Sequence, residues 1–248
     1  VNLIVYVNTF YLSRPGGRSE NQDYCESMTA GDYTCFVLAD GLGGHHGGEI
    51  ASKTAAEAIL SRFAANPCIS PKDIRDYLLA GQNAVLETQE RDTLVSAMRT
   101  TAVVLVIGED AAVWGHVGDS RMYVFRRGSV FLQTEDHSVP QAMVHAGDLH
   151  ARKIRGHEDR NRLLRTLGKD DDFRPEIPGD TFALMNGDVF LLCSDGFWEY
   201  VTETAMEIEL AKAASPEEWL RGMELRITAA AEPRHDNYSA IAIFVEQE

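Results

Sequence analysis

The chain has 248 residues, enough for one large domain or two small ones, and its 44% hydrophobic and 8% aromatic content is ordinary for a globular protein. Its 38 acidic residues outnumber the 23 basic ones and give a formal net charge of −15. Because nucleic acids and anionic membranes are polyanions, this charge argues against either as the main partner. A surplus of carboxylates is usually a solvated surface, but it also supplies the oxygen ligands that Mg²⁺ and Mn²⁺ prefer.

The N-terminal segment VNLIVYVNTFYLS is predicted to be a strand, because Val1, Leu3, Val5 and Val7 alternate with other residues. It lacks the basic flank and the small-residue cleavage site of a secretion signal. No apolar stretch in the sequence reaches the roughly 20 residues that a membrane helix needs. The four cysteines have no zinc-site spacing and require no oxidising compartment. Together these features predict a cytoplasmic protein.

One strand and two helices are expected next. The apolar run before Asp40 predicts a buried strand, and residues 48–66 combine helical spacing with many alanines. A second helix is predicted to begin with Ser70 as N-cap and Pro71 at its first position, and to run to Gln89. We expect the two helices to pack as a pair.

From residue 100 to about residue 131 the pattern favours strands, at 100–107, 111–117, 121–126 and 129–133. Their joints at 108–110, 118–120 and 127–128 have the composition of hairpin turns, which predicts antiparallel neighbours. Residues 136–165 are polar and mixed and predict an irregular surface subdomain. A strand at 188–195, a helix after residue 215 and a final strand at 238–246 follow. Without any linker composition, the chain is predicted to be a single α+β domain, residues 1–248, with helix pairs covering the sheet faces.

Five aspartates stand at strand boundaries. Asp40 and Asp195 each end an apolar strand and precede glycine, in FVLADG and FLLCSDG, and the others are Asp23, Asp119 and Asp236. Any one of them alone is most often a turn former. Five together favour a pair of divalent cations about 3.5–4 Å apart, bridged by carboxylates, with a water between them as the nucleophile. The glycine after Asp40 would let the backbone carbonyl approach an ion.

The glycine-rich loop after Asp40 has two less favoured interpretations. A strand, glycines and then a helix is the setting of a dinucleotide or phosphate site, but the loop lacks G-K-[ST] and misses the GxGxxG spacing by one residue. His45 and His46 could bind zinc, but adjacent side chains on an extended segment point apart.

Seven motifs, in order, resemble the PPM (type 2C) family of metal-dependent protein serine/threonine phosphatases in its compact bacterial form. They are RSENQD (18–23), DGLGGHHGGEIAS (40–52), GHVGDSR (115–121), DHS (136–138), RTLG (165–168), SDGFWEYV (194–201) and HDN (235–237). The resemblance covers nearly the whole chain. It implies a four-layer α/β/β/α sandwich with two central antiparallel sheets, a metal cleft at one end and a flap at about 136–165.

The resemblance also implies a set of metal ligands. Asp40 would bridge two ions, and Gly41 would contribute its backbone carbonyl. Asp195 and Asp236 would complete the protein ligands of one ion. Asp23 is similar to the acid that holds the second ion through water. The cofactors implied are two or three divalent cations, Mn²⁺ or Mg²⁺.

Further roles follow from the same resemblance. Asp119 together with Asp195 would support a third ion, and Arg18 would bind the substrate phosphate. Asn237 would orient the neighbouring ligands. Where some members have a histidine after the bridging Asp-Gly as a proposed general acid, this chain has Leu42.

The activity implied is hydrolysis of phosphoserine and phosphothreonine on proteins, by direct attack of a metal-bridging hydroxide. The segment between residues 140 and 168 resembles stand-alone bacterial phosphatases that oppose a eukaryotic-like serine/threonine kinase, including some tied to type VI secretion. Neither nucleic acid nor a membrane is expected as a partner. Two alternatives stay open, which are a catalytically silent phosphoprotein-binding regulator and a hydrolase of small phosphoesters. A dinucleotide-binding oxidoreductase is a remote third.

Overall fold

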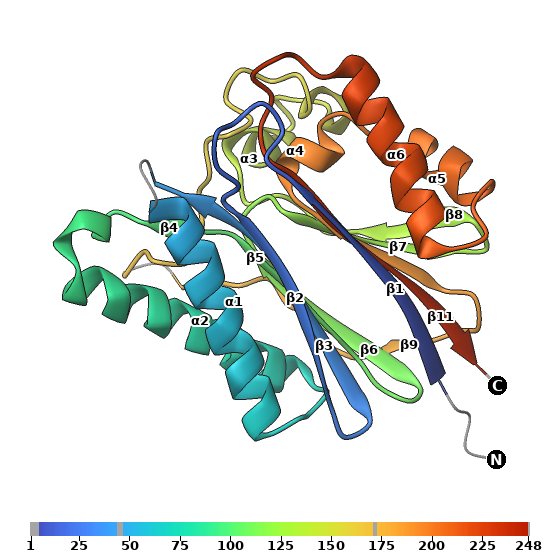
Figure 1. The fold of residues 1–248 in the computed structure, drawn as a ribbon, viewed down its shortest axis with the longest axis horizontal. Helices are drawn as coiled ribbons and strands as arrows, with labels where there is room; N and C mark the ends of the chain where they lie inside the picture. The colour runs from blue at the N-terminus through green and yellow to red at the C-terminus, as the bar shows by residue number, and fades with distance from the viewer. Residues whose placement is uncertain (1–4, 44–46, 171–172, 248) are drawn as a thin grey trace.

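The computed structural model describes residues 5–43, 47–170 and 173–247, and two antiparallel β-sheets form its centre (Figure 1). The first sheet has the order β1 (Val5–Arg14), β11 (Tyr238–Gln247), β10 (Val189–Cys193), β7 (Arg121–Arg126) and β8 (Ser129–Gln133). The second has the order β2 (Asp23–Ala30), β3 (Tyr33–Leu42), β5 (Ala102–Ile107), β6 (Ala111–Val117) and β9 (Phe182–Ala183), and β4 (Arg99–Thr100) pairs with β3.

Helices cover the outer faces of both sheets (Figure 1). The long pair α1 (Gly47–Ala65) and α2 (Pro71–Arg91) lies on the second sheet, and α5 (Glu203–Leu210) and α6 (Pro216–Ala230) lie on the first. The described residues also form the short helices α3 (Val139–Ala146) and α4 (Asp195–Trp198) and two 3₁₀ turns, η1 (Thr93–Val95) and η2 (Ala151–Lys153). The predicted helix pair and the α+β, α/β/β/α architecture are confirmed.

Strand β3 shows why the central strands of the two sheets are apolar at consecutive positions. Its residues Cys35 and Val37 pack under α1 and α2, whereas Phe36 and Leu38 pack between the two sheets. Successive side chains of a strand point to opposite faces, so a strand covered on both faces needs apolar residues at every position. Cys35 and Cys193 are fully buried, and all four cysteines are free thiols.

One predicted turn is wrong. The joints at 108–110 and 127–128 are hairpins, but residues 118–120 carry the chain from β6 in one sheet to β7 in the other. Gly118 has φ +106°, and a Cβ there would lie 2.5 Å from the Cγ2 atom of Thr101. The crossing between the sheets therefore requires glycine. It places Asp119 at the end of the sandwich rather than in a hairpin.

The segment 136–165 is more regular than predicted, because it contains α3. Ser138 caps the helix by accepting a hydrogen bond from the Gln141 backbone N–H, and Gly147 ends it with φ +83°. The sequence analysis also did not identify β2, α4 or α5. Val1 and Leu3 of the predicted first strand lie outside the described residues, as do His45 and His46. In the part of the chain that the structure describes, no helix has the length and apolarity to cross a membrane, and the cytoplasmic location stays a prediction.

Candidate metal centre

A cavity of about 430 Å³ opens at one end of the sandwich. It is lined by seven of the eight residues that the sequence analysis proposed for the site, namely Arg18, Asp40, Gly41, Asp119, Asp195, Asp236 and Asn237. Asp40 comes from β3, Asp195 is the first residue of α4 directly after β10, and Asp236 precedes β11. Acids from both central sheets therefore line the same cavity.

The cavity carboxyls lie close to one another, Asp119 buried and Asp40, Asp195 and Asp236 half-buried, and this changes the protonation of three of them. Burial, followed by repulsion from neighbouring carboxylates, raises the pKa of Asp40 and of Asp119 well above the usual range. Burial and repulsion from Asp236 raise the pKa of Asp195 to about 6. Buried anions this close need positive charge between them. An all-oxygen donor set fits a hard divalent cation such as Mg²⁺ or Mn²⁺.

Asp23 lies behind the cavity rather than on its lining. It is the register partner of Asp40, and its Oδ2 atom accepts a hydrogen bond of 2.8 Å from the Ser194 hydroxyl. Its Oδ1 atom is buried and has no protein hydrogen-bond partner. Burial is the main cause that raises the pKa of Asp23 to about 7, with Asp195 and Asp236 adding repulsion. A buried oxygen of this kind is where a water or a cation would bind.

Arg18 stands half-exposed at the cavity. Its Nη2 atom donates to Oδ2 of Asp236 at 2.9 Å, while the backbone N–H of Asn237 donates to Oδ1 of the same carboxylate. The guanidinium is therefore held beside the acids with other N–H groups remaining for an anion. A planar fork of this type pairs well with two oxygens of a phosphate.

Asn237 does not touch a carboxylate through its side chain. Its Oδ1 atom accepts from the Gln22 backbone N–H at 2.9 Å, and its Nδ2 atom donates to the carbonyls of Pro15 and Glu20 at 2.9 and 2.8 Å. These bonds tie the segment that carries Arg18 to the start of β11. The Asn237 side chain thus positions the segment that carries Arg18.

Two threonines that the sequence analysis missed hold the Asp40 backbone. The hydroxyl of Thr101 accepts from the Asp40 N–H at 2.9 Å, and the hydroxyl of Thr100 donates to the Asp40 carbonyl at 2.8 Å. Gly41 is also required for a second reason, because a Cβ there would lie 2.0 Å from the carbonyl oxygen of Gly48 in α1. None of these contacts has a local sequence signal, since the partners are distant in the chain.

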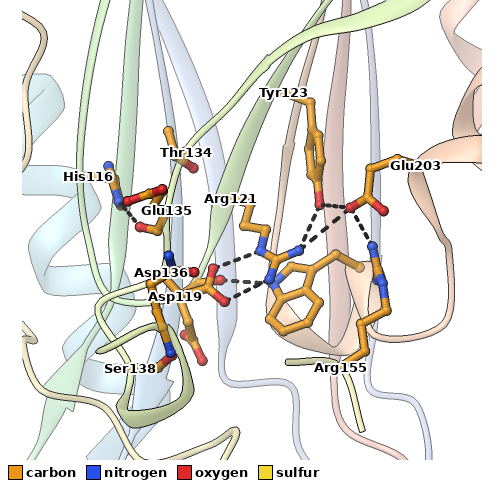
Figure 2. Close-up of polar contacts among 12 residues, drawn as sticks. His116, Asp119, Arg121, Tyr123, Thr134, Glu135, Asp136, Ser138, Arg155 and Glu203 are labelled. Atoms are coloured by element: carbon orange, nitrogen blue, oxygen red, sulfur yellow. Dashed lines mark hydrogen bonds and ion pairs between the residues drawn. The ribbon is translucent and has the colours of Figure 1, made fainter. Parts of the chain in front are cut away.

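A buried ion pair lies beside Asp119 (Figure 2). Arg121 donates from Nε and Nη2 to the two carboxylate oxygens of Asp136, each at 2.7 Å, and from Nη1 to the Tyr123 hydroxyl at 3.1 Å. Both charged side chains are at most 4% exposed. A two-bond pair in the interior fixes the orientation of both partners. Arg121 and Asp136 belong to the GDSR and DHS motifs, although the sequence analysis gave them no role.

Among the described residues, the one group of three His, Cys, Asp or Glu with ligand atoms within 4.8 Å of one another is His116, His137 and Glu176. The histidine group is a poor cation site, because the Gly118 N–H donates to Nδ1 of His137 and the Arg165 guanidinium lies 3.3 Å from its Nε2. The rings of His116 and His137 stack at 4.6 Å, and burial lowers the pKa of His116 to about 4. We assign this group to packing.

Comparison with known proteins gives a consistent result. The family model described as protein phosphatase 2C matches residues 16–221. Protein phosphatase PhpP of Streptococcus pneumoniae is 30% identical over 189 residues, which cover 75% of this chain and 76% of that protein. The solved structure of the S. agalactiae serine/threonine phosphatase has a TM-score of 0.85 and 26% identity, covering 97% of this chain and 100% of that one. PppA, described as a key regulatory component of T6SS in Pseudomonas aeruginosa, has a TM-score of 0.77 and 25% identity over the full length of both chains.

The family match spans most of the sandwich and includes four of the five aspartates, and the fold of the S. agalactiae enzyme extends over nearly the whole chain. The chain therefore belongs to the PPM (protein phosphatase 2C) family and is a protein serine/threonine phosphatase.

Proposed function

We propose that the chain hydrolyses phosphoserine and phosphothreonine in proteins at the cavity that holds Asp40, with two or three Mn²⁺ or Mg²⁺ ions as cofactors. The observation that carries this is the convergence of Asp40, Asp119, Asp195 and Asp236 in one cavity with an arginine beside them. When bound, such ions supply a water nucleophile at neutral pH and neutralise charge on the phosphoryl oxygens. Asp40, the Gly41 carbonyl, Asp195 and Asp236 would hold two of them.

The remaining residues position the substrate and the ligands. Arg18 would bind two oxygens of the transferring phosphoryl group, in an orientation set by its contact with Asp236. Asp23 would support the second ion through water, and Asp119 with Asp195 would support a third. Leu42 lines the cavity and has no ionisable group, so we assign no side chain as general acid.

We propose that residues 1–248 act as one catalytic domain, in which the flap segment (residues 136–165) lies beside the active site and selects among phosphoproteins. Asn161 and Leu163 of this segment line the cavity, which supports that role. The partner would be a phosphoprotein that an opposing serine/threonine kinase has modified. The similarity to PppA makes a type VI secretion regulator one candidate for that pathway.

Hydrolysis of p-nitrophenyl phosphate and of a phosphothreonine peptide in Mn²⁺, with and without EDTA, tests the proposal. Asp40→Asn and Asp195→Asn should each abolish turnover of both substrates, while Asp32→Asn, in the exposed β2–β3 turn, should leave it unchanged. Full turnover in either cavity variant would refute the site. Turnover of the small ester alone would favour the small-phosphoester hydrolase. Peptide binding without turnover in the wild type would favour the silent regulator.

A further inference from the structure

The indole of Trp198 joins two of the cavity acids. Trp198 is the last residue of α4, the four-residue helix that begins at Asp195, and its side chain is almost fully buried. Its Nε1–H donates to the backbone carbonyl of Asp119 at 2.9 Å. One rigid side chain therefore connects the element that carries Asp195 to the crossing between sheets that carries Asp119.

The ring is held by arginines. The guanidinium carbon of Arg121 lies 3.6 Å from the Trp198 ring centroid, and that of Arg155 lies 5.5 Å from it. Figure 2 shows how both guanidinium groups are anchored, Arg121 by Asp136 and Arg155 by Glu203. Cations packed on an aromatic ring stabilise its orientation, the more so when they are desolvated. The direction of the indole N–H is thus set by charged neighbours that are themselves paired.

Hydrogen bonds to His137 also hold the segment that crosses between the two sheets. The Gly118 N–H donates to Nδ1 of His137 at 3.2 Å, and the His137 N–H donates to the Gly118 carbonyl at 2.9 Å. These bonds fix Gly118, whereas the carbonyl of Asp119 itself is bonded by Trp198. The indole therefore adds a second link, besides the β7–β10 pairing of Arg121 with Cys193, between the segments that carry Asp119 and Asp195.

We propose that Trp198 is a positioning residue for a third divalent cation that Asp119 and Asp195 would hold. The inference rests on the proposed function. The ions that Asp40 would bridge also draw on Asp195, but their other ligands, Asp40, the Gly41 carbonyl and Asp236, lie on segments that Trp198 does not contact through this bond. An ion between Asp119 and Asp195 would depend more on the placement of the Asp119 backbone, which the indole holds. Outer contacts of this kind typically change metal affinity by about 10- to 100-fold.

Trp198→Phe tests the proposal, and Trp219→Phe is its matched control. Trp219 in α6 is also fully buried and donates its Nε1–H to the Met206 carbonyl at 2.9 Å, but it packs in the layer between α6 and the first sheet. Mn²⁺ binding is followed by electron paramagnetic resonance and calorimetry, which resolve classes of site without turnover. We expect Trp198→Phe to weaken the loosest class about 10-fold or more and to leave the tight class unchanged. Trp219→Phe should lower thermal stability alone.

The outcomes separate the two proposals. A wild-type protein without Mn²⁺-dependent hydrolysis refutes the proposed function. An active wild type with no third class of Mn²⁺ site, or equal Mn²⁺ binding in the two tryptophan variants, refutes the inference alone. If Trp198→Phe does not fold, Trp198 is replaced by β-(3-benzothienyl)alanine, in which sulfur stands in place of the indole N–H. The same weakening is then expected, and unchanged Mn²⁺ binding overturns the proposal.

Discussion

Substitution of Gly41 by alanine should damage both stability and activity. The added Cβ would lie 2.0 Å from the carbonyl oxygen of Gly48 and 2.3 Å from its carbonyl carbon. Ordinary contacts of a Cβ begin at 3.4 Å, so the strand and the helix would have to separate by 3.4 − 2.0 = 1.4 Å. Neither side yields easily, since Gly41 is paired with Thr100 in β4 and its N–H donates to the Gln22 carbonyl at 3.1 Å.

The size of the effect follows from that displacement. Overpacking of a well-packed interior costs about 1–3 kcal/mol of unfolding free energy, and we expect the upper end because the atoms that Cβ meets are backbone. A misplacement of about 1 Å at a catalytic group costs about 100-fold in rate. Because Gly41 is the proposed carbonyl ligand next to Asp40, turnover of p-nitrophenyl phosphate in saturating Mn²⁺ should fall by about this factor.

Urea denaturation and initial rates measure the two effects. Gly179→Ala is the control, since a Cβ at Gly179 meets no atom within 4 Å, and it should change the unfolding free energy by less than about 0.5 kcal/mol. Wild-type stability and rate in Gly41→Ala would show that α1 does not constrain the metal centre as described.

Three other predictions follow from the same contacts. Arg18→Lys should lower kcat/KM for the phosphopeptide by about 10-fold, since an ammonium group cannot pair two phosphate oxygens in one plane. Asp136→Asn should lower the unfolding free energy by about 3–5 kcal/mol in urea, because buried Arg121 loses its two-bond partner and its remaining carboxylate contact is the longer one of 3.8 Å with Glu203. The EDTA-treated protein should lose thermal stability between pH 5 and pH 8. In the folded protein the pKa of Asp195 is raised to about 6 and that of Asp23 to about 7, whereas the unfolded pKa is about 4. The raised values stabilise the folded state fully at a pH below about 4, and this stabilisation is lost as the pH rises through the folded pKa values.

Each of these has a control. Glu87→Gln removes an exposed pair with Arg91 and should cost less than about 1 kcal/mol, so an equal loss in Asp136→Asn would contradict the role of burial. An unchanged kcat/KM in Arg18→Lys would remove Arg18 from phosphate binding. A melting temperature in EDTA that rises from pH 5 to pH 8 would contradict the pKa directions, whereas added Mn²⁺ should reverse the loss by neutralising the carboxylates.

The secondary structure that local chemistry controls was predictable. Helix α2 carries its own start signal in Ser70 and Pro71, and β5 and β6 are apolar runs joined by a turn of Gly, Glu and Asp. The architecture and the acids of the site were reached through the order of the motifs, which resembles a known family. Helix α3 was missed although Ser138 and Gly147 cap it, because the polar residues around it hid its short apolar face.

The sequence by itself therefore determined most of the element types, because strand periodicity and helix caps are local, while the sandwich and the set of acids followed from the order of the motifs and the family resemblance. Only the tertiary structure decided that the chain changes sheets at Gly118, that Asp23 lies behind the cavity, and that Trp198 holds the Asp119 carbonyl. A turn of Gly, Asp and Ser has the same local sequence pattern whether it closes a hairpin or crosses between two sheets. Whether the next strand pairs in the same sheet or in the other one depends on which strand edge is free and which apolar face it can cover. Those partners are distant in the sequence and meet only when the chain has folded.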